Sequence, residues 1–358
     1  MVRAAVLSET NGTHEIREIA LRDLGPRDVR VRIAAAGICH SDLSLANGTL
    51  VQTFPAVLGH EGSGTVDAVG SDVTHVAAGD RVVLNWAPPC RTCWFCTHGE
   101  PWLCENSAAA SRQPHATFDG VDLFPGIGTG AFAEETVVPA AAVIPIPDDI
   151  PLEVAALLGC AVLTGVGAIQ NTGRVAAGET VLVLGLGGVG LSALQGARLA
   201  GASKVIAADL SPDKEEMARR CGATDFLVGG DDLAKRIRVL TEGRGVDVGL
   251  ECVGRSATIR QTWSCVRRGG RAVIVGVGSN DDRVDFGALE LFYFARSIAG
   301  CVYGATDPDV DVPRLIEAWR AGDLDLEALV TNRTDLAGVD EAFAQMRAGH
   351  GGRTLLIP

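Results

Sequence analysis

The chain lacks the features that mark secreted, membrane-spanning and nucleic-acid-binding proteins. Residues 1–7 show no long apolar segment and no cleavage site, so we expect a cytoplasmic protein. Charge runs, low-complexity segments and internal repeats do not occur either. The formal net charge of −13 argues against a nucleic acid or an anionic membrane as a partner, because like charges repel.

Long apolar runs are scarce as well. Two uncharged stretches, 154–173 and 180–197, have the length of a membrane span. Glycines interrupt both, and the second has the pattern of a strand, a turn and a helix. We therefore expect buried core rather than membrane helices. With 358 residues, of which 47% are hydrophobic and 21% charged, the chain is long enough for two domains with a large core.

Four of the ten cysteines are clustered: Cys90, Cys93, Cys96 and Cys104 have the spacing C-x2-C-x2-C-x7-C. In a reducing compartment such clusters are more often metal ligands than disulfides. Four thiolates complete the tetrahedron around one Zn²⁺ and leave no position for a substrate. The cluster therefore predicts a structural zinc site, in a lobe at about 88–106.

The first third of the chain is typical of a β-rich domain. Residues 29–33, 64–69 and 81–84 alternate or cluster β-branched side chains between turns. The segment 143–151 is interrupted by prolines and marks a domain boundary.

Beyond this boundary strand-like and helical runs alternate, which predicts βαβ units and a parallel sheet. The expected strands are 181–184, 204–208, 246–251 and 271–277, and the expected helices are 191–200, 212–221 and 256–268. From about residue 303 we expect helices at 312–321 and 339–348 and a strand at 353–357. This last part need not belong to the middle domain.

A dinucleotide-binding loop is predicted at Gly185-Leu186-Gly187-Gly188-Val189-Gly190, which satisfies G-x-G-x-x-G between an apolar strand and a helical run. Glycines let the backbone approach a pyrophosphate, and the helix N-terminus offers free N–H groups. Asp209 ends the next strand, where its carboxylate would bind both ribose hydroxyls and repel a 2′-phosphate. NAD is therefore favoured over NADP. The alternative is a purely structural turn with a surface aspartate.

Three further residues suit a second metal ion: Cys39, His60 and Cys160. Two cysteines and one histidine leave the fourth position of a zinc ion open, as in catalytic sites. Each residue also has a simpler explanation as a buried core residue. Their separations, 21 and 100 residues, carry no geometric information, so the residues alone leave the choice open. Cys221, Cys252, Cys265 and Cys301 are expected to be ordinary buried residues.

Together these motifs resemble the zinc-dependent medium-chain alcohol dehydrogenase family. The run Gly59-His60-Glu61-x2-Gly64-x5-Gly70 is similar to the family's zinc signature, and the remaining motifs follow in the family's order over essentially the whole chain. The resemblance implies an α/β fold with a GroES-like, β-rich catalytic domain and a Rossmann coenzyme domain with a doubly wound parallel sheet. The implied segments are 1–161 (catalytic), 162–302 (Rossmann) and 303–358 (catalytic).

The resemblance also implies roles for single residues. Cys39, His60 and Cys160 would bind the catalytic zinc, and the four clustered cysteines the structural zinc. Ser41 would take the substrate's proton, Asp42 would hold the His60 ring, and Glu61 would approach the metal during ligand exchange. His40 and Arg353 would contact the cofactor pyrophosphate, Lys214 the adenosine ribose and Thr164 the nicotinamide. The other implied cofactor contacts are Gly185, Gly187, Gly188, Val189, Gly190, Asp209, Val253, Val275 and Val277, and Leu50 and Trp86 would line the substrate pocket.

The implied activity interconverts primary alcohols and aldehydes by hydride transfer from a zinc-bound alkoxide to the nicotinamide of NAD, with two zinc ions per chain. A homodimer or homotetramer is implied, paired through the strand-like segment 297–303. One residue departs from the pattern. Many relatives have a histidine three positions after the proton-accepting hydroxyl, and this chain has Ser44.

Two alternatives remain. The segments 84–86, 128–133 and 169–173 resemble the mycothiol-dependent formaldehyde dehydrogenase branch, which oxidises a thiol adduct of formaldehyde. Resemblance at this level discriminates poorly among substrates. A non-enzymatic nucleotide-binding relative is the other alternative. Such relatives commonly lose zinc ligands, whereas this chain keeps both sets.

Overall fold

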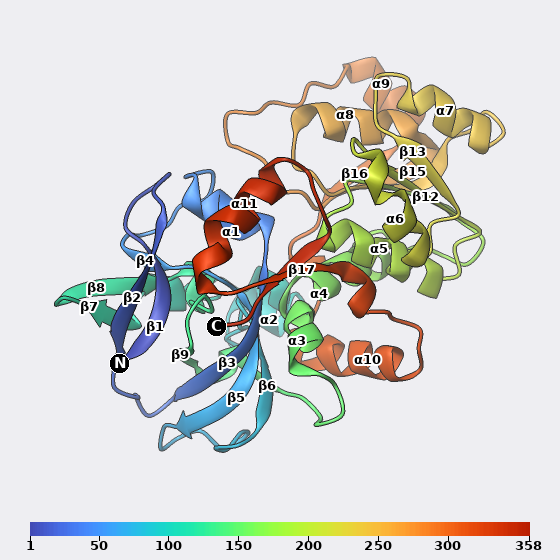
Figure 1. Ribbon diagram of the computed structural model, residues 1–358. Coiled ribbons are helices and arrows are strands. Elements are labelled where there is room, and N and C mark those ends of the chain that lie inside the picture. Colours follow the sequence, from blue (N-terminus) through green and yellow to red (C-terminus); the bar gives the residue numbers. More distant parts are fainter. The chain divides into compact units, whose positions relative to one another are not determined.

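The computed structural model describes residues 1–358 and divides them into two compact units (Figure 1). The first comprises Met1–Ala161, Asp307–Arg320 and Val330–Pro358, and the second comprises Val162–Thr306 and Ala321–Leu329. The boundaries lie at 161/162 and 306/307, against 161/162 and 302/303 implied by the resemblance, and residues 321–329 return to the second unit.

Two β-structures form the first unit. Five short strands close a barrel in the order β1-β2-β7-β8-β4, and a seven-stranded sheet has the order β10-β6-β5-β3-β18-β17, with β9 also paired to β3. The strands are β1 Val2–Leu7, β2 His14–Leu21, β3 Asp28–Ile38, β4 Ala56–Val57, β5 Glu61–Val69, β6 Arg81–Leu84, β7 Ala116–Phe118, β8 Val121–Pro125, β9 Glu135–Pro139, β10 Val143–Pro145, β17 Val330–Thr334 and β18 Arg353–Leu356.

Alternation explains the central strand of this sheet. Val29, Val31 and Ile33 of β3 are buried in the core, whereas Arg30 and Arg32 between them stay at the surface. The expected strands at 29–33, 64–69 and 81–84 are confirmed as parts of β3, β5 and β6.

Short helices accompany the strands of the first unit. They are α1 His40–Ala46, α2 Trp94–Thr97, η1 Pro101–Leu103, η2 Ala110–Arg112, η3 Gly126–Gly128, η4 Ala140–Ala142, α3 Leu152–Ala155, η5 Ala156–Gly159, α10 Pro308–Arg320, η10 Leu336–Gly338 and α11 Val339–Arg347. Helix α11 buries Val339, Ala342 and Phe343, at the spacing of one helix face, in the core.

The last strand completes the first unit. Strand β18 pairs antiparallel with β3, so that Leu355 lies opposite Gly37 and Thr354 opposite Ile38. The strand expected at 353–357 is confirmed. Its pairing places Arg353 beside the end of β3, where Cys39 follows.

The second unit contains a six-stranded parallel sheet in the order β13-β12-β11-β14-β15-β16. Because the chain runs outward from β11 to one side and then from β14 to the other, the sheet is doubly wound, with its switch point between β11 and β14. The strands are β11 Thr180–Leu184, β12 Lys204–Asp209, β13 Asp225–Val228, β14 Val246–Glu251, β15 Val266–Ile274 and β16 Ser297–Gly300.

Helices connect the strands of the second unit in βαβ order, and α4 and η6 precede its first strand. They are α4 Ala161–Gly167, η6 Ala168–Thr172, α5 Gly188–Leu199, η7 Pro212–Lys214, α6 Glu215–Arg220, α7 Leu233–Leu240, α8 Ser256–Cys265, α9 Ala288–Phe294, η8 Tyr303–Ala305 and η9 Glu327–Leu329. The helix expected at 256–268 was wrong at its end. It stops at Cys265 because the β-branched Val266 adopts extended backbone and pairs with Val246 of β14.

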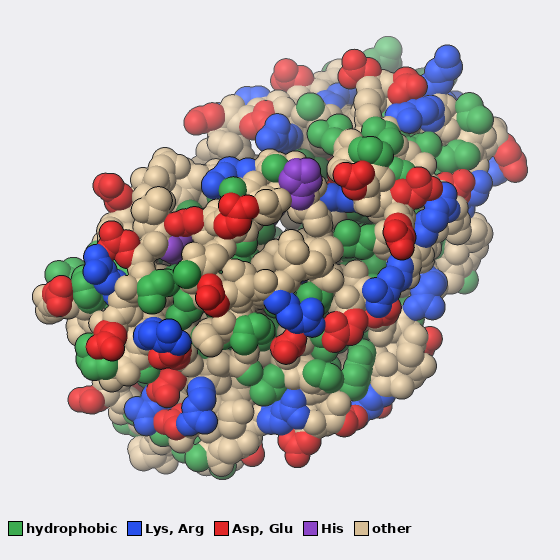
Figure 2. Space-filling model, in the orientation of Figure 1, with side chains coloured by type: hydrophobic (Ala, Val, Ile, Leu, Met, Phe, Trp, Pro, Cys, Tyr) green, Lys and Arg blue, Asp and Glu red, His purple; other side chains and the backbone are tan.

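No single helix is long and apolar enough to cross a membrane. The bent pair Leu152–Gly159 and Ala161–Thr172 is long and apolar enough only when its two helices are taken together, and most of its residues are buried. On the face shown in Figure 2, acidic and basic side chains are interspersed over the surface.

Candidate functional site

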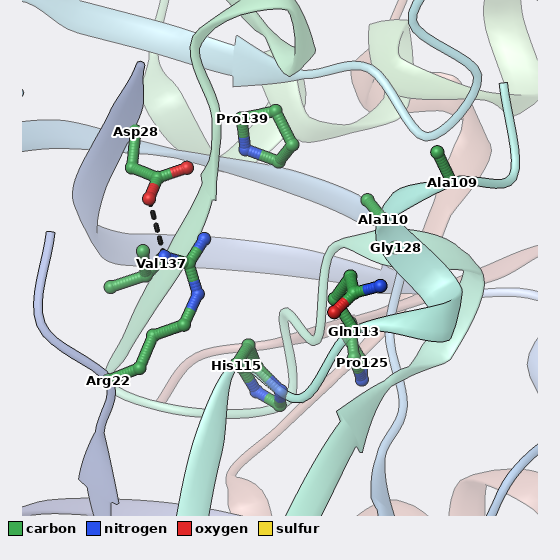
Figure 3. Close-up of a pocket in the computed structure, with 10 residues that line it drawn as sticks. All are labelled: Arg22, Asp28, Ala109, Ala110, Gln113, His115, Pro125, Gly128, Val137 and Pro139. Carbon is green, nitrogen blue, oxygen red and sulfur yellow. Dashed lines mark hydrogen bonds and ion pairs between the residues drawn. The ribbon is translucent and has the colours of Figure 1, made fainter. Parts of the chain in front are cut away.

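The first unit contains a cavity of about 250 Å³ (Figure 3). It contains an ion pair between Arg22 and Asp28 and the ring of His115, whose Nδ1 donates to the carbonyl of Leu123 at 3.2 Å. Burial lowers the pKa of His115 to about 4, so this ring stays neutral near pH 7. Neither potential metal set contributes to the lining of this cavity.

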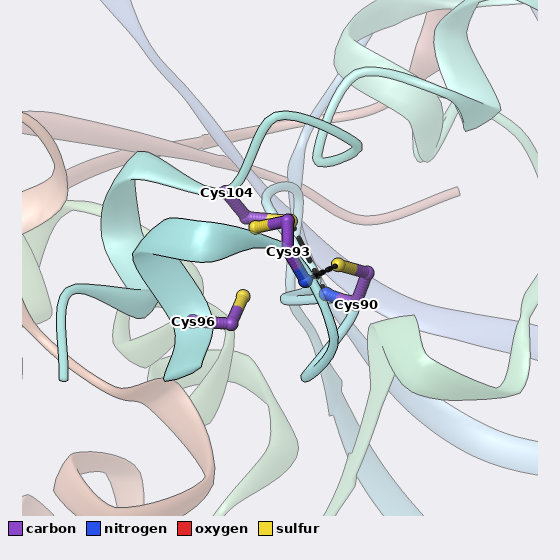
Figure 4. A group of neighbouring side chains, drawn as sticks. All are labelled: Cys90, Cys93, Cys96 and Cys104. Carbon is purple, nitrogen blue, oxygen red and sulfur yellow. Dashed lines mark hydrogen bonds between the residues drawn. The ribbon is translucent and has the colours of Figure 1, made fainter. Parts of the chain in front are cut away.

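The four clustered cysteines surround a common point (Figure 4). Cys93 caps α2, Cys96 lies in this helix, Cys90 precedes it and Cys104 follows η1. Their sulfur atoms all lie within 4.8 Å of one another, and none forms a disulfide.

Hydrogen bonds favour the thiolate form of Cys90 and Cys93, whereas burial and the neighbouring Cys93 sulfur raise the pKa of Cys96 to about 12. The amides of Cys93 and Cys90 donate to the sulfurs of Cys90 at 3.3 Å and Cys104 at 3.2 Å, and Asn106 Nδ2 donates to Cys90 at 3.4 Å. Hydrogen bonds from Thr92 and Asn106 lower the pKa of Cys90 to about 5. Crowded thiolates repel one another unless a cation lies between them. The donor set therefore fits a closed Zn²⁺ site.

A second set of donors lies in the same unit. Cys39, His60, Glu61 and Cys160 are all buried, and one donor atom of each lies within 4.8 Å of the others. Cys39 caps the N-terminus of α1, His60 and Glu61 stand at the start of β5, and Cys160 follows η5. The structure thus brings together the three residues that the sequence could not connect by spacing.

Asp42 holds this set in place. Its Oδ1 accepts from His60 Nδ1 at 2.9 Å and from the Gly59 amide at 3.1 Å, and its Oδ2 accepts from the Cys39 amide at 3.0 Å. Because a carboxylate oxygen accepts, Nδ1 of the neutral ring carries the proton and Nε2 presents its lone pair. His60 Nε2 is buried and has no hydrogen-bond partner in the protein. Two sulfurs and this nitrogen fit a Zn²⁺ ion with an open fourth position.

The charge of the set also favours a cation. Burial lowers the pKa of the His60 ring, but Asp42 and the Cys39 sulfur raise it well above its usual value. The hydrogen bond with Cys160 holds the pKa of Cys39 well below its usual value, and Arg353 and His60 act in the same direction. The groups around His60 therefore carry negative charge, which attracts a cation.

Arg353 lies against this second set. Its guanidinium is buried, with Nη2 at 3.1 Å from Glu61 Oε1 and Nη1 donating to the Ile38 carbonyl at 2.8 Å. Burial raises the pKa of Glu61 to about 7 although Arg353 opposes this shift. Glu61 Oε1 also accepts from the Ala161 amide at 2.9 Å. The sequence did not reveal this ion pair, and a pyrophosphate contact by Arg353 stays a prediction.

The other predicted residues of this region lie at varying depth. Ser41 is half-buried, with its Oγ 3.8 Å from the Cys39 sulfur. Trp86 sets its ring edge-to-face with His60, with centroids 6.3 Å apart. His40 is exposed at the start of α1, and Leu50 packs partly buried on the core.

The glycine loop of the second unit adopts the predicted strand–turn–helix geometry. Gly185 follows β11 with φ of +95°, and α5 begins at Gly188. A Cβ at Gly190 would overlap the carbonyl oxygen of Gly185, so the turn requires glycine there. The helix has twelve residues, and its first N–H groups are available to an anion.

Asp209 lies at the end of β12, beside this loop. Its Oδ2 accepts from the Leu186 amide at 2.8 Å and lies 3.3 Å from Lys214 Nζ, while Oδ1 accepts from the Ser211 amide at 3.0 Å. Lys214 is buried, as is Thr164 in α4. These contacts fix the carboxylate at the carboxyl edge of the sheet, where such folds bind dinucleotides.

The remaining predicted cofactor contacts lie on two adjoining loops. Val253 and Val277 are exposed and Val275 is half-buried. Sequence reasoning missed Glu251, whose buried Oε1 accepts from the amides of Val253 at 3.0 Å and Gly254 at 2.8 Å. No sequence signal marks this residue, because its role depends on the turn that follows β14.

Comparison with known proteins agrees with this geometry. Residues 25–148 match the model of the alcohol dehydrogenase GroES-like domain, and residues 188–319 match that of the zinc-binding dehydrogenases. The chain is 36% identical to the putative alcohol dehydrogenase D of Mycobacterium tuberculosis, with 99% of each chain covered. It is 33% identical to the S-(hydroxymethyl)glutathione dehydrogenase of Paracoccus denitrificans, also with 99% of each covered.

Solved structures are similar over the full length. An alcohol dehydrogenase zinc-binding domain protein from Burkholderia ambifaria superposes with a TM-score of 0.94 at 31% identity, covering 100% of this chain and 99% of that one. The benzyl alcohol dehydrogenase of Acinetobacter calcoaceticus gives 0.92 at 28%, with 99% of each covered. A putative zinc-binding dehydrogenase from Sinorhizobium meliloti, solved with NADP, gives 0.84 at 27%, covering 100% and 99%.

The closed cysteine site generates a stability prediction. Cys96→Ser removes one of four sulfurs, so the protein should lose about one zinc per chain and its unfolding midpoint should fall by more than about 5 °C. Metal analysis and thermal unfolding measure both effects. Cys221→Ala, at a buried cysteine outside both sets, is the control and should retain the wild-type zinc content. An unchanged zinc content in Cys96→Ser would contradict the assignment.

Proposed function

The chain belongs to the zinc-dependent medium-chain alcohol dehydrogenase family, and from that premise we propose that it is an NAD-dependent enzyme that interconverts primary alcohols and aldehydes. The observation that carries the proposal is the buried set of Cys39, His60 and Cys160, with His60 Nε2 unpaired in the protein. Three ligands of this kind suit a catalytic zinc, and the four-cysteine lobe suits a structural one.

Bound zinc would polarise the substrate oxygen, and bound nicotinamide would exchange hydride with the substrate carbon. The chain's own residues supply the rest. Asp42 holds the His60 ring and its tautomer, and Ser41 Oγ receives the proton of the substrate hydroxyl during oxidation. Ser44, whose position is buried in α1, is not a base, so the proton leaves Ser41 through water or the cofactor ribose.

Asp209 supports NAD over NADP. Three donors already fix its carboxylate, so it can accept from ribose hydroxyls without reorganising. A 2′-phosphate at the same place would face a negative charge, although Lys214 offsets part of it. The similar protein from Sinorhizobium meliloti was solved with NADP, so the fold alone does not decide the choice of cofactor.

Trp86 beside His60 favours apolar primary alcohols as substrates. Benzyl alcohol is a suitable test compound, since a similar structure is named for this activity. A second candidate is the thiol adduct of formaldehyde, favoured by the 33% identity to an S-(hydroxymethyl)glutathione dehydrogenase. We assign the enzyme to the cytoplasm.

We also propose a homodimer that pairs through the edge strand β16, or a homotetramer in which other faces take part as well. All four residues of β16 are exposed, Ile298 among them, and Phe292 and Leu289 of the adjoining chain segment expose large apolar surfaces. An unpaired edge strand can join its symmetry mate into one continuous sheet.

The function is tested by assaying primary alcohols, including benzyl alcohol, with NAD, and formaldehyde with and without mycothiol or glutathione. We expect oxidation of the apolar alcohols without added thiol, in protein with about two zinc per chain. Activity on formaldehyde that depends strictly on the thiol would establish the second candidate instead. Zinc-loaded protein inactive on all these substrates would contradict both.

Ser41→Ala tests the proton step. Loss of the hydroxyl should lower kcat by at least about 100-fold, because positioned proton transfer contributes this much, and zinc content should stay at the wild-type value. Ser71→Ala, at an exposed serine, is the control and should keep the wild-type kcat. A Ser41→Ala enzyme with near-wild-type turnover would remove Ser41 from the mechanism.

Asp209→Gly tests the choice of cofactor. Removing charged hydrogen bonds to the ribose should raise the KM for NAD by roughly tenfold or more. It should also reduce the preference of the enzyme for NAD over NADP. Steady-state kinetics with both cofactors measure this. Asp231→Gly, at an exposed turn, should leave both constants unchanged. Unaltered KM values for both cofactors in Asp209→Gly would show that the carboxylate does not face the ribose.

A further inference from the structure

The segment 128–133 has a position in the fold that the reaction described above does not explain. It begins at the last residue of η3, and its Thr129 is 1% exposed. The hydroxyl of Thr129 donates to the carbonyl of Gly59 at 2.7 Å, across 70 positions of the chain. Gly59 immediately precedes His60.

Gly59 is held in an unusual conformation. Its φ is +91°, which L side chains rarely adopt, and a Cβ would clash with the Phe132 ring. Its carbonyl accepts from the Ala131 amide at 2.9 Å as well as from Thr129, and its amide donates to Asp42 Oδ1 at 3.1 Å. Both sides of this residue are therefore fixed by hydrogen bonds, two of them from the segment 128–133.

The contacts continue in both directions. Thr136 in β9, which is fully buried, donates its hydroxyl to the Thr129 carbonyl at 2.6 Å. At the other end, Asp42 Oδ1 accepts from both the Gly59 amide and His60 Nδ1. A chain of buried hydrogen bonds thus runs from Thr136 through Thr129 and Gly59 to Asp42 and His60. Away from water such bonds are strong and directional.

We propose that Thr129 is a positioning residue for the metal ligand His60, acting through Gly59 and Asp42. The inference depends on the proposed role of His60 as a zinc ligand. Without the Thr129 hydroxyl, the Gly59 carbonyl keeps one donor of two, and the turn before His60 gains freedom. Mutation of a residue that hydrogen-bonds a metal ligand typically lowers metal affinity by about 10–100-fold. Thr129 lies one hydrogen bond further from the metal ligand, so we expect an effect at the lower end of this range.

The alternative is that Thr129 only packs the interior. Thr129→Val separates the two roles, because valine keeps the shape and lacks the hydroxyl. Thr129→Ser restores the hydroxyl without the methyl group. The matched control is Thr262→Val in α8, a fully buried threonine of the second unit whose hydroxyl has no partner in the protein.

The experiment measures zinc release to a chromogenic chelator and the visible spectrum of protein with Co²⁺ in the catalytic set. Zinc should leave the two sites in two phases. The phase that is missing in His60→Ala belongs to the catalytic set. In Thr129→Val we expect this phase to be about tenfold faster and the Co²⁺ bands to shift, while the phase of the four-cysteine lobe stays unchanged. Thr129→Ser should restore both readouts, and Thr262→Val should match the wild type.

Wild-type release and Co²⁺ bands in Thr129→Val would overturn the proposal, as would failure of Thr129→Ser to restore them. If Thr129→Val does not fold, Thr136→Val replaces it. Thr136→Val should also make the release of zinc from the catalytic set faster, and release at the wild-type rate would then overturn the proposal. If His60 is not a zinc ligand, the result looks different, because the wild-type protein would then contain one zinc or none and would show no second release phase. If only the proposed reaction fails, the zinc-loaded protein is inactive on all the substrates but still shows both release phases.

Discussion

The second metal set depends on one buried carboxylate. Asp42 is fully buried, and its two oxygens accept from the Cys39 amide, the Gly59 amide and the His60 ring. An unpaired carboxylate in this position would cost several kcal/mol, so the three donors and Asp42 require one another. The same contacts join the start of α1 to the start of β5, and they set the distance between the proposed ligands Cys39 and His60.

The sheet of the first unit brings the other members to this point. Strand β18 lies against β3, so Arg353 from the end of the chain reaches Glu61 and the Ile38 carbonyl. Cys160 arrives after η5, where Gly159 packs so closely that a Cβ would press on the Leu84 carbonyl. The arrangement of the second metal set therefore depends on backbone packing between segments that are remote in sequence.

Local features were predictable from the sequence, and long-range ones were not. The four cysteines within fifteen residues and the glycine loop between a strand and a helix carry their geometry in their spacing, and the structure agrees with both. The end predicted for α8 was wrong. The helical pattern of the sequence continues past Cys265, but the pairing of Val266 with Val246 outweighs it. Cys39, His60 and Cys160 were connected only by resemblance. The bonds of Thr129 to Gly59 and of Arg353 to Glu61 left no sequence signal, because each joins residues whose contact is decided by the sheet.

The central claim is that one chain builds two zinc sites of different kind, one closed by four sulfurs and one with two sulfurs, a nitrogen and an open position. X-ray absorption at the zinc edge of the purified protein tests it most directly. Averaged over both sites, each zinc should have about three sulfur neighbours at about 2.3 Å and about one nitrogen or oxygen neighbour at about 2.0–2.1 Å. A spectrum with four sulfurs per zinc would mean that the lobe alone binds metal, and it would contradict the account.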